Sequence, residues 1–227
     1  MIYSPDHNFL LLKNRKVGGS SLEIVLSKVL PDNAIVTKLN NHGNTWDVIP
    51  EDHKERNYKD YFYNHIKYEE VKKKIDLTNV KSYVFVRNPY NAVLSAFFHR
   101  LNSSSIWNAS PNPNSWSALL ENERDEWVDQ YFAGTLGNLP WYKSDKYIFL
   151  DKNGNQAVDK ILYYEKGIEE EINPILKLHG ISTISLNVHH LKHRPEKIVY
   201  KDVFKKRHLS QIRKEWAWEF ENLNYLP

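Results

Sequence analysis

The sequence predicts a three-layer α/β protein with a mostly parallel central sheet, helices on both faces and an additional β-hairpin. Short apolar runs of strand length alternate with longer segments whose apolar residues recur at helical spacing, which is the pattern of a parallel sheet. Glycine or proline marks the turns between them. Neither an internal repeat nor a linker interrupts the pattern, so we expect residues 1–227 to form a single domain.

The first unit of the pattern reads strand, tight loop, helix. Phe9–Lys13 is a short apolar run and is expected to be a buried strand. A helix is expected to begin at Ser20, where Glu23 stands three residues later as in a capping box, and to end at Pro31. The glycine-containing loop between strand and helix is the first candidate for a binding site.

The other elements follow from the same signals. Asn153-Gly154 joins two short β-rich runs, residues 147–151 and 157–163, and predicts the hairpin. Residues 102–115 are rich in Ser, Asn and Pro and are expected to form a mobile loop, a possible substrate lid. The remaining expected strands are 34–39 and 82–87, and the expected helices are 68–75, 89–101, 116–133, 168–178 and 207–220, with irregular segments at 40–64 and 185–200.

Composition limits the possible functions. Hydrophobic residues make up 41% and charged residues 26%, as in ordinary globular proteins. The formal net charge of +3 suits an anionic ligand but is too small to indicate nucleic-acid binding. The chain has no cysteine, which excludes disulfides and thiolate metal sites. The polar N-terminus carries no targeting signal or apolar span, so we expect a cytoplasmic protein.

The segment Lys16-Val17-Gly18-Gly19-Ser20-Ser21 has the features of an anion-binding loop. Backbone N–H groups at a helix N-terminus attract anions, and glycines let a phosphate approach the backbone. The hydroxyl groups of the two serines, Lys16 and neighbouring Arg15 add donors and positive charge. The lysine precedes the glycines, so the segment is not a Walker A motif. Taken alone, it fits a ligand-free turn equally well.

A second candidate anion site lies further along the chain. Arg87 closes an apolar strand, at the end where α/β proteins bind ligands, and its guanidinium can grip a phosphate with two hydrogen bonds. Ser95 follows eight residues later, about two turns into the next helix. It could reach the same group if strand and helix converge, or it could simply be a buried serine.

Together these segments resemble the two cofactor motifs of the PAPS-dependent sulfotransferase superfamily, where PAPS is 3′-phosphoadenosine-5′-phosphosulfate. Lys16–Leu22 is similar to its 5′-phosphosulfate loop, and Val86–Phe97 to its 3′-phosphate motif, with Asn88 where Asp is usual. Residues 64–71, 151–165, 200–202 and 218–225 resemble further segments of the carbohydrate O-sulfotransferase family in the same order. The resemblance implies a P-loop-like fold that binds PAPS and releases PAP through residues 15–21, Arg87 and Ser95.

The resemblance also implies a mechanism. Lys16 would stabilise the leaving oxygen of the nucleotide. His65 would act as the general base that takes the proton of an acceptor hydroxyl, with His42 as the second choice. The absence of the membrane anchor of animal relatives points to a bacterial-type or viral soluble enzyme. The mechanism requires no metal ion.

The acceptor cannot be identified from the sequence, although the family favours a carbohydrate hydroxyl. Trp46 lies in one of several tryptophan-containing segments compatible with sugar stacking, with Trp107, Trp116 and Trp141 in the others. His189, His190 and His193 are spaced like metal ligands but lack a matching carboxylate, so His189 and Lys192 are taken as acceptor contacts, or with Arg194 and Lys197 as a solvated basic face. The competing hypotheses are a P-loop-type small-molecule kinase and a non-catalytic binder of acidic polysaccharide.

Overall fold

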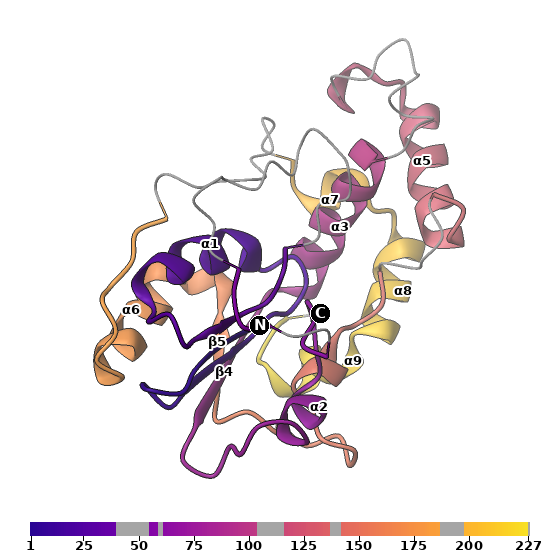
Figure 1. Cartoon of the computed structure of the whole chain (residues 1–227). Helices are drawn as coiled ribbons and strands as arrows, with labels where there is room; N and C mark the ends of the chain where they lie inside the picture. The colour runs from indigo at the N-terminus through magenta and orange to yellow at the C-terminus, as the bar shows by residue number, and fades with distance from the viewer. Residues whose placement is uncertain (40–54, 59–60, 104–115, 137–141, 187–197, 227) are drawn as a thin grey trace. The chain divides into compact units, whose positions relative to one another are not determined.

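A computed structural model describes residues 1–39, 55–58, 61–103, 116–136, 142–186 and 198–226 (Figure 1). The chain forms two compact units. The first comprises Met1–Arg87 and Asp145–His193, and the second comprises Asn88–Ser144 and Arg194–Pro227. The chain therefore passes between them after Arg87, after Ser144 and after His193. The single domain of residues 1–227 stays a prediction.

A five-stranded sheet forms the centre of the first unit. Its strand order is β3 (Ile35–Val36), β1 (Ile2–Ser4), β2 (Phe9–Leu12), β4 (Lys81–Val86) and β5 (Lys160–Tyr163). Strands β2, β4 and β5 are parallel, whereas β1 pairs antiparallel with both β2 and β3. The mixed α/β class with a mostly parallel sheet flanked by helices is thus confirmed.

Helices α1 (Gly19–Val29) and α6 (Ile168–Leu178) pack on the same face of this sheet (Figure 1). Each fully buried leucine or isoleucine on that face contributes about 1.5–3 kcal/mol by leaving water. The alternate strand residues, such as Leu10, Val84 and Val86, are buried as well, so both faces of the sheet are covered. The core contacts of the first face come from Leu11, Phe85, Leu22, Leu26, Ile172 and Leu176.

The second unit is helical and has an aromatic core. It contains α3 (Pro89–Ser103), the short helix η1 (Trp116–Ala118), α5 (Glu121–Ala133), α7 (Tyr200–Val203), α8 (Lys206–Glu215) and α9 (Ala217–Asn222). Phe97 of α3 is fully buried, and its ring meets Trp116 and Tyr131 edge to face, with centroids 5.3 and 5.4 Å away. Trp116 is therefore a core residue, and its buried ring is not available to stack on a sugar.

The predicted hairpin is not formed as expected. Where the first strand was expected, the chain forms the short helix η2 (Lys146–Ile148), and only Leu150 and Gln156 make an antiparallel bridge. Asp151 instead closes a local loop, because its Oδ1 accepts hydrogen bonds from the backbone N–H groups of Asn153 and Asn155. The second expected strand becomes β5, which joins the main sheet parallel to β4.

Other boundaries differ in smaller ways. Strand β1 was not predicted, and it begins the chain with a hairpin to β2. The expected last helix divides at Trp216 into α8 and α9, and the Trp216 Nε1–H donates to the carbonyl of Tyr142 over 2.7 Å. Helix α2 (Tyr68–Lys72) is shorter than the expected helix 68–75.

Candidate functional site

The carboxyl ends of three parallel strands converge in the first unit. Lys13 follows β2, Arg87 follows β4, and the short helix η3 (Tyr164–Lys166) follows β5. The register pairs Leu12 with Val84 in one ladder and Val86 with Tyr163 in the other, so these connections leave the same edge of the sheet. This edge is where ligands bind in parallel α/β folds.

The loop between β2 and α1 is held in a demanding backbone conformation. Lys16 has φ of 60° and Gly18 has φ of 73°, both in the left-handed region. A Cβ atom at Gly18 would lie 2.6 Å from Cδ1 of Ile168, so any other residue there would strain the backbone and displace that side chain. Val17 is buried in the core, which leaves its backbone rather than its side chain for a ligand.

The capping box expected from Ser20 and Glu23 is wrong. Helix α1 begins one residue earlier, with Gly18 as its N-cap, and among the described residues no side chain caps it. The N–H of Leu22 bonds to the carbonyl of Gly18 over 3.1 Å, which leaves the N–H groups of Gly19, Ser20 and Ser21 without intrahelical acceptors. These donors and the helix dipole suit an anion.

Glu23 is a buried carboxylate beneath the loop. It forms an ion pair with the buried Lys13 and accepts hydrogen bonds from the amino group of Met1 at 2.6 Å and the hydroxyl of Thr37 at 3.2 Å. Burial alone would raise the pKa of Glu23, but Lys13 and the amino group outweigh it, and the pKa is lowered. A Cβ at Gly19 would lie 2.9 Å from Cγ of Lys13, so the side chain of Lys13 packs directly against the loop backbone.

His65 is bound to the same strand end. Its Nδ1 lies 2.9 Å from the carbonyl oxygen of Lys13, and its φ of 62° places the residue in the left-handed region. A carbonyl only accepts, so Nδ1 carries the proton and Nε2 keeps a lone pair. Burial, helped by the positive charges of Lys13 and Arg15, lowers the pKa of His65 to about 3. His65 is therefore a neutral, oriented imidazole.

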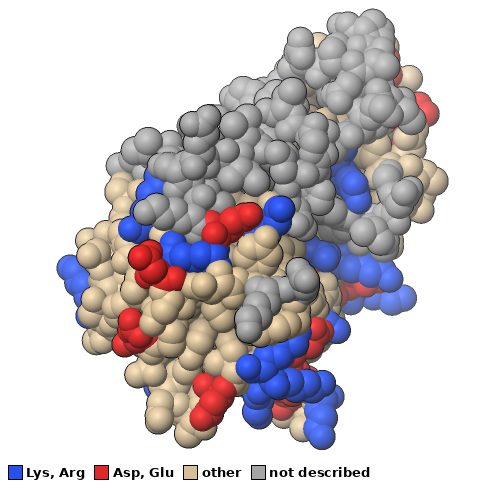
Figure 2. All heavy atoms as spheres, in the orientation of Figure 1, with Lys and Arg blue, Asp and Glu red and all other residues tan. Residues whose placement is uncertain are grey.

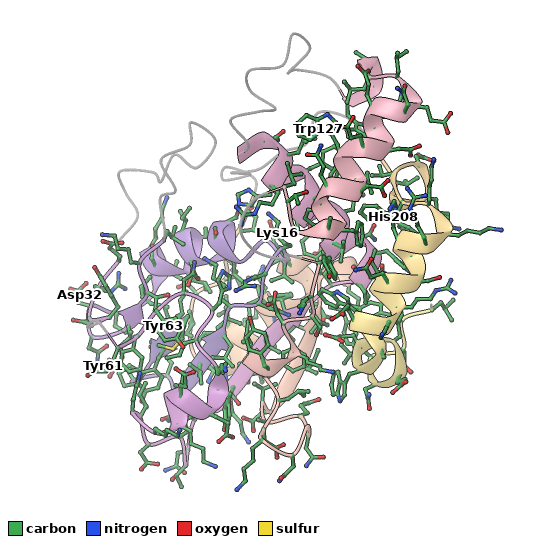
Figure 3. The ribbon with its side chains drawn as sticks, turned by 90° about the vertical axis from the view of Figure 1, so that its right-hand side faces the viewer. Lys16, Asp32, Tyr61, Tyr63, Trp127 and His208 are labelled. Carbon is green, nitrogen blue, oxygen red and sulfur yellow. The ribbon has the colours of Figure 1, made fainter. Side chains whose placement is uncertain are left out.

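Arg87 connects the second predicted motif to the loop. Its Nη1 donates to the carbonyl of Lys16 over 2.9 Å, and its guanidinium lies 4.3 Å from the ring centroid of Tyr164. Both contacts fix a half-buried cation beside the loop. Figure 3 marks Lys16 in this part of the first unit.

The comparison with protein families decides the class. A model described as the sulfotransferase family matches residues 1–225. The chain belongs to the sulfotransferase family. The resemblance seen in the sequence is thereby confirmed, and with it a PAPS-dependent enzyme that transfers a sulfuryl group.

No curated protein matches the chain. A solved structure, mouse sulfotransferase SULT7A1 complexed with PAP, is similar with 14% identity and a TM-score of 0.45, covering 96% of this chain and 85% of that chain.

The sulfotransferase loop also makes an ion pair that the sequence did not suggest. Nη1 of Arg15 lies 3.1 Å from Oδ1 of the buried Asp145, which also accepts a 2.9 Å hydrogen bond from the hydroxyl of Tyr147. Burial raises the pKa of Asp145, against the opposing effect of Arg15. Sequence reasoning did not assign Asp145, Glu23 and Tyr164 to the site, because their contacts with the loop follow from tertiary packing.

Other predicted residues of this sulfotransferase stand as follows. Ser95 lies half-buried on α3 of the second unit, and a phosphate contact shared with Arg87 stays a prediction. Asn88 accepts hydrogen bonds from the N–H groups of Tyr90 and Asn91 at 3.1 and 3.4 Å, so it caps α3 as the usual aspartate could. His42, Trp46, Trp107, Trp141, His189, His190, Lys192, His193, Arg194 and Lys197 lie outside the described residues.

The described residues offer neither a metal-binding cluster nor a membrane-spanning helix. No group of three or more His, Cys, Asp or Glu side chains there is arranged to hold a metal ion. Within the same residues, no helix has both the length and the apolar character needed to cross a membrane.

Proposed function

We propose that this sulfotransferase moves the sulfuryl group of PAPS to a hydroxyl of a carbohydrate acceptor, with residues 1–227 acting as one domain. His65 serves as the general base, and Lys16 stabilises the charge that develops on the leaving oxygen. The observation that carries the proposal is the 2.9 Å contact between Nδ1 of His65 and the carbonyl of Lys13. This hydrogen bond attaches the neutral imidazole of His65 to the end of β2, the strand that leads into the phosphate loop.

The residues of the first unit fit an anionic sulfuryl donor. The uncapped first turn of α1 offers backbone N–H donors, and Lys16 and Arg87 offer positive charge beside them. When bound, PAPS supplies the activated sulfuryl group and its leaving nucleotide. Gly18, Gly19, Ser20 and Ser21 bind through the loop backbone and hydroxyls, Val17 through its backbone alone, and Ser95 is proposed to add a contact to the 3′-phosphate.

Each proposed catalytic residue has a defined task. The lone pair on Nε2 of His65 accepts the acceptor's hydroxyl proton as the oxygen begins to bond to sulfur. Lys16 lies in the loop that leads into α1. Its ammonium and the positive end of the α1 dipole both stabilise the negative charge that develops on the leaving oxygen as its bond to sulfur breaks. His65 remains neutral until it receives this proton, because its pKa is about 3 before the reaction.

Transfer of radiolabelled sulfate from PAPS to a panel of glycans and small alcohols tests this proposal. We expect Lys16→Ala and His65→Ala to lower kcat by about 100-fold or more. Lys177→Ala, which removes an exposed lysine in the last turn of α6, is the matched control and should behave as wild type.

The outcomes separate the class from the assigned roles. Calorimetry should show that PAP binds to wild type and to His65→Ala with the same affinity, because His65 acts on the acceptor. Absence of PAP binding would overturn the donor assignment, and unchanged transfer by both variants would overturn the roles of the two residues.

A further inference from the structure

The exposed aromatic side chains of the described residues are concentrated in one part of the first unit. They are Tyr61, Tyr63 and Tyr147, each between 41% and 45% exposed. Exposed aromatic rings are costly to keep in water, and most rings in this protein are at least half buried. Their positions therefore call for a physical explanation.

Tyr147 connects directly to the phosphate loop. Its hydroxyl donates to Oδ1 of Asp145 over 2.9 Å, and the same oxygen lies 3.1 Å from Nη1 of Arg15. Arg15 is also one of the charges that lower the pKa of His65, so it lies close to both groups. Nζ of Lys67 lies 5.2 Å from the Tyr147 ring centroid. The Tyr147 ring is thus exposed, while its hydroxyl is held by Asp145, which forms an ion pair with Arg15 at the start of the loop.

Tyr63 has the same two features as Tyr147: its ring is exposed, and its hydroxyl is held by a carboxylate. Its hydroxyl donates to Oε2 of Glu70 over 2.6 Å. This bond is the largest cause that raises the pKa of Tyr63 to about 12, and Tyr147 is the last of the other causes, so the two phenols interact electrostatically. Tyr63 precedes His65 by two residues. In the view of Figure 3, Tyr63 lies on the Lys16 side of Tyr61.

Anchored, exposed rings suit one kind of ligand. Carboxylates hold the hydroxyl ends of both tyrosines, so little side-chain entropy remains to be lost on binding. The apolar C–H face of a pyranose stacks on such a ring, while its hydroxyls need charged or polar partners at the rim. Lys67, Glu70 and the Asp145–Arg15 pair supply those partners. Figure 2 shows lysine and arginine side chains gathered at the lower right, where Figure 1 places α2, with acidic groups among them.

We propose that Tyr63, Tyr147 and Lys67 form a subsite that binds a sugar ring of the acceptor next to the one that is sulfated. This inference rests on the proposed function, because it assumes a saccharide whose reacting hydroxyl meets His65. Neighbouring sugars then extend along the surface that begins at the Arg15–Asp145 pair. Tyr61 is not assigned to the subsite, because its ring contacts Phe62, with centroids 4.7 Å apart, and Nζ of Lys74 at 5.3 Å rather than the residues around Arg15 and Asp145.

The test uses the full chain and unsulfated hexasaccharides of heparosan, chondroitin and cellulose. The one that wild type sulfates fastest serves as the probe. Tyr147→Ala and Tyr63→Ala should each raise KM for this probe by about tenfold, the equivalent of about 1.4 kcal/mol, with kcat and PAP affinity little changed. Tyr61→Ala, an equally exposed tyrosine of the same segment, is the matched control and should retain the wild-type KM. Tyr147→Phe keeps the ring but loses the hydrogen bond to Asp145, so its KM should lie between those of wild type and Tyr147→Ala.

Each outcome decides a different claim. If the KM values of Tyr147→Ala and Tyr63→Ala equal that of Tyr61→Ala while transfer persists, the subsite is wrong and the proposed function stands. If PAP binds but wild type sulfates none of the hexasaccharides, or only a peptide tyrosine or an alkanol, the saccharide acceptor and the subsite are both wrong. If PAP does not bind, the proposed function itself fails.

Discussion

His65 shows how its surroundings set the chemistry of one residue. A histidine in water is half protonated near pH 6.5 and is a poor base below that value. Burial and two nearby cations lower the pKa of His65 to about 3, which keeps the ring unprotonated at neutral pH but also makes it a weaker base. The Lys13 carbonyl selects the tautomer that leaves a lone pair on Nε2. An exposed loop histidine would have neither property.

The rate profile should report this environment. The base is active when unprotonated, so a pKa of about 3 keeps it active throughout pH 5 to 8. We expect kcat/KM, which reflects the free enzyme, to show no acid limb near pH 6.5. Steady-state rates at saturating and limiting PAPS, with PAP affinity measured at each pH, check this. A limb near 6.5 that disappears in His65→Gln would contradict the buried, neutral state.

Glu23 shows why sequence reasoning reached only part of the site. Its spacing from Ser20 fits a capping box, yet its carboxylate bonds instead to Lys13, ten residues earlier and on a different element. Arg15 and Asp145, 130 residues apart, form a comparable pair. Such partners follow from tertiary packing, which no local pattern encodes. Lys16, Arg87 and His65 were predicted because family motifs mark them. Lys16 is also marked by its place in the glycine-containing loop, and Arg87 by its place at a strand end.

At the scale of elements, the strand-loop-helix unit was predictable and its neighbours were less so. The apolar run of β2 and the glycines before α1 are local signals, and the structure has both elements. Strand β1 is only three residues long and lies in a polar segment, so its pairing with β2 gave no local signal. The run before Tyr163 has strand character, but its partner is β4, more than 70 residues earlier, rather than the nearer run across Asn153-Gly154.

Substitutions at two glycines separate the cost of backbone strain in the phosphate loop from the cost of a side-chain clash. Gly18 and Gly134 have φ of 73° and 78°, but a Cβ at Gly18 meets Ile168 at 2.6 Å, whereas nothing lies within 4 Å of one at Gly134. Gly134→Ala should cost about 1 kcal/mol from backbone strain alone. Gly18→Ala should cost a further 1–3 kcal/mol, approximately, from the clash, and should weaken PAP binding. Urea unfolding and calorimetry check both; equal costs would show that Ile168 moves away freely.

Among the described residues, the second unit also contains a buried histidine, His208. His208 stacks on Phe132 with centroids 4.8 Å apart and bonds through Nε2 to Asp129 over 2.7 Å. Burial, the largest cause, lowers the pKa of His208. Below pH 6.5 the unfolded chain therefore protonates both histidines before the folded chain does. The contribution of these two histidines to the free energy of unfolding should be complete above pH 6.5. It should be lost as the pH decreases toward their pKa values in the folded protein.

This pH dependence tests whether residues 1–227 unfold as one domain. Between pH 7 and pH 5, His65 alone should account for a loss of about 2 kcal/mol, and His65→Gln should remove that part of the slope. His208→Gln should remove its own part. In a single domain, thermal unfolding shows one transition, and each variant flattens the pH dependence of that transition. Two transitions, one responding to His65→Gln and the other to His208→Gln, would instead mean that the two units fold independently. Scanning calorimetry across this pH range distinguishes the two cases, because His65 and His208 report on different units of the same chain.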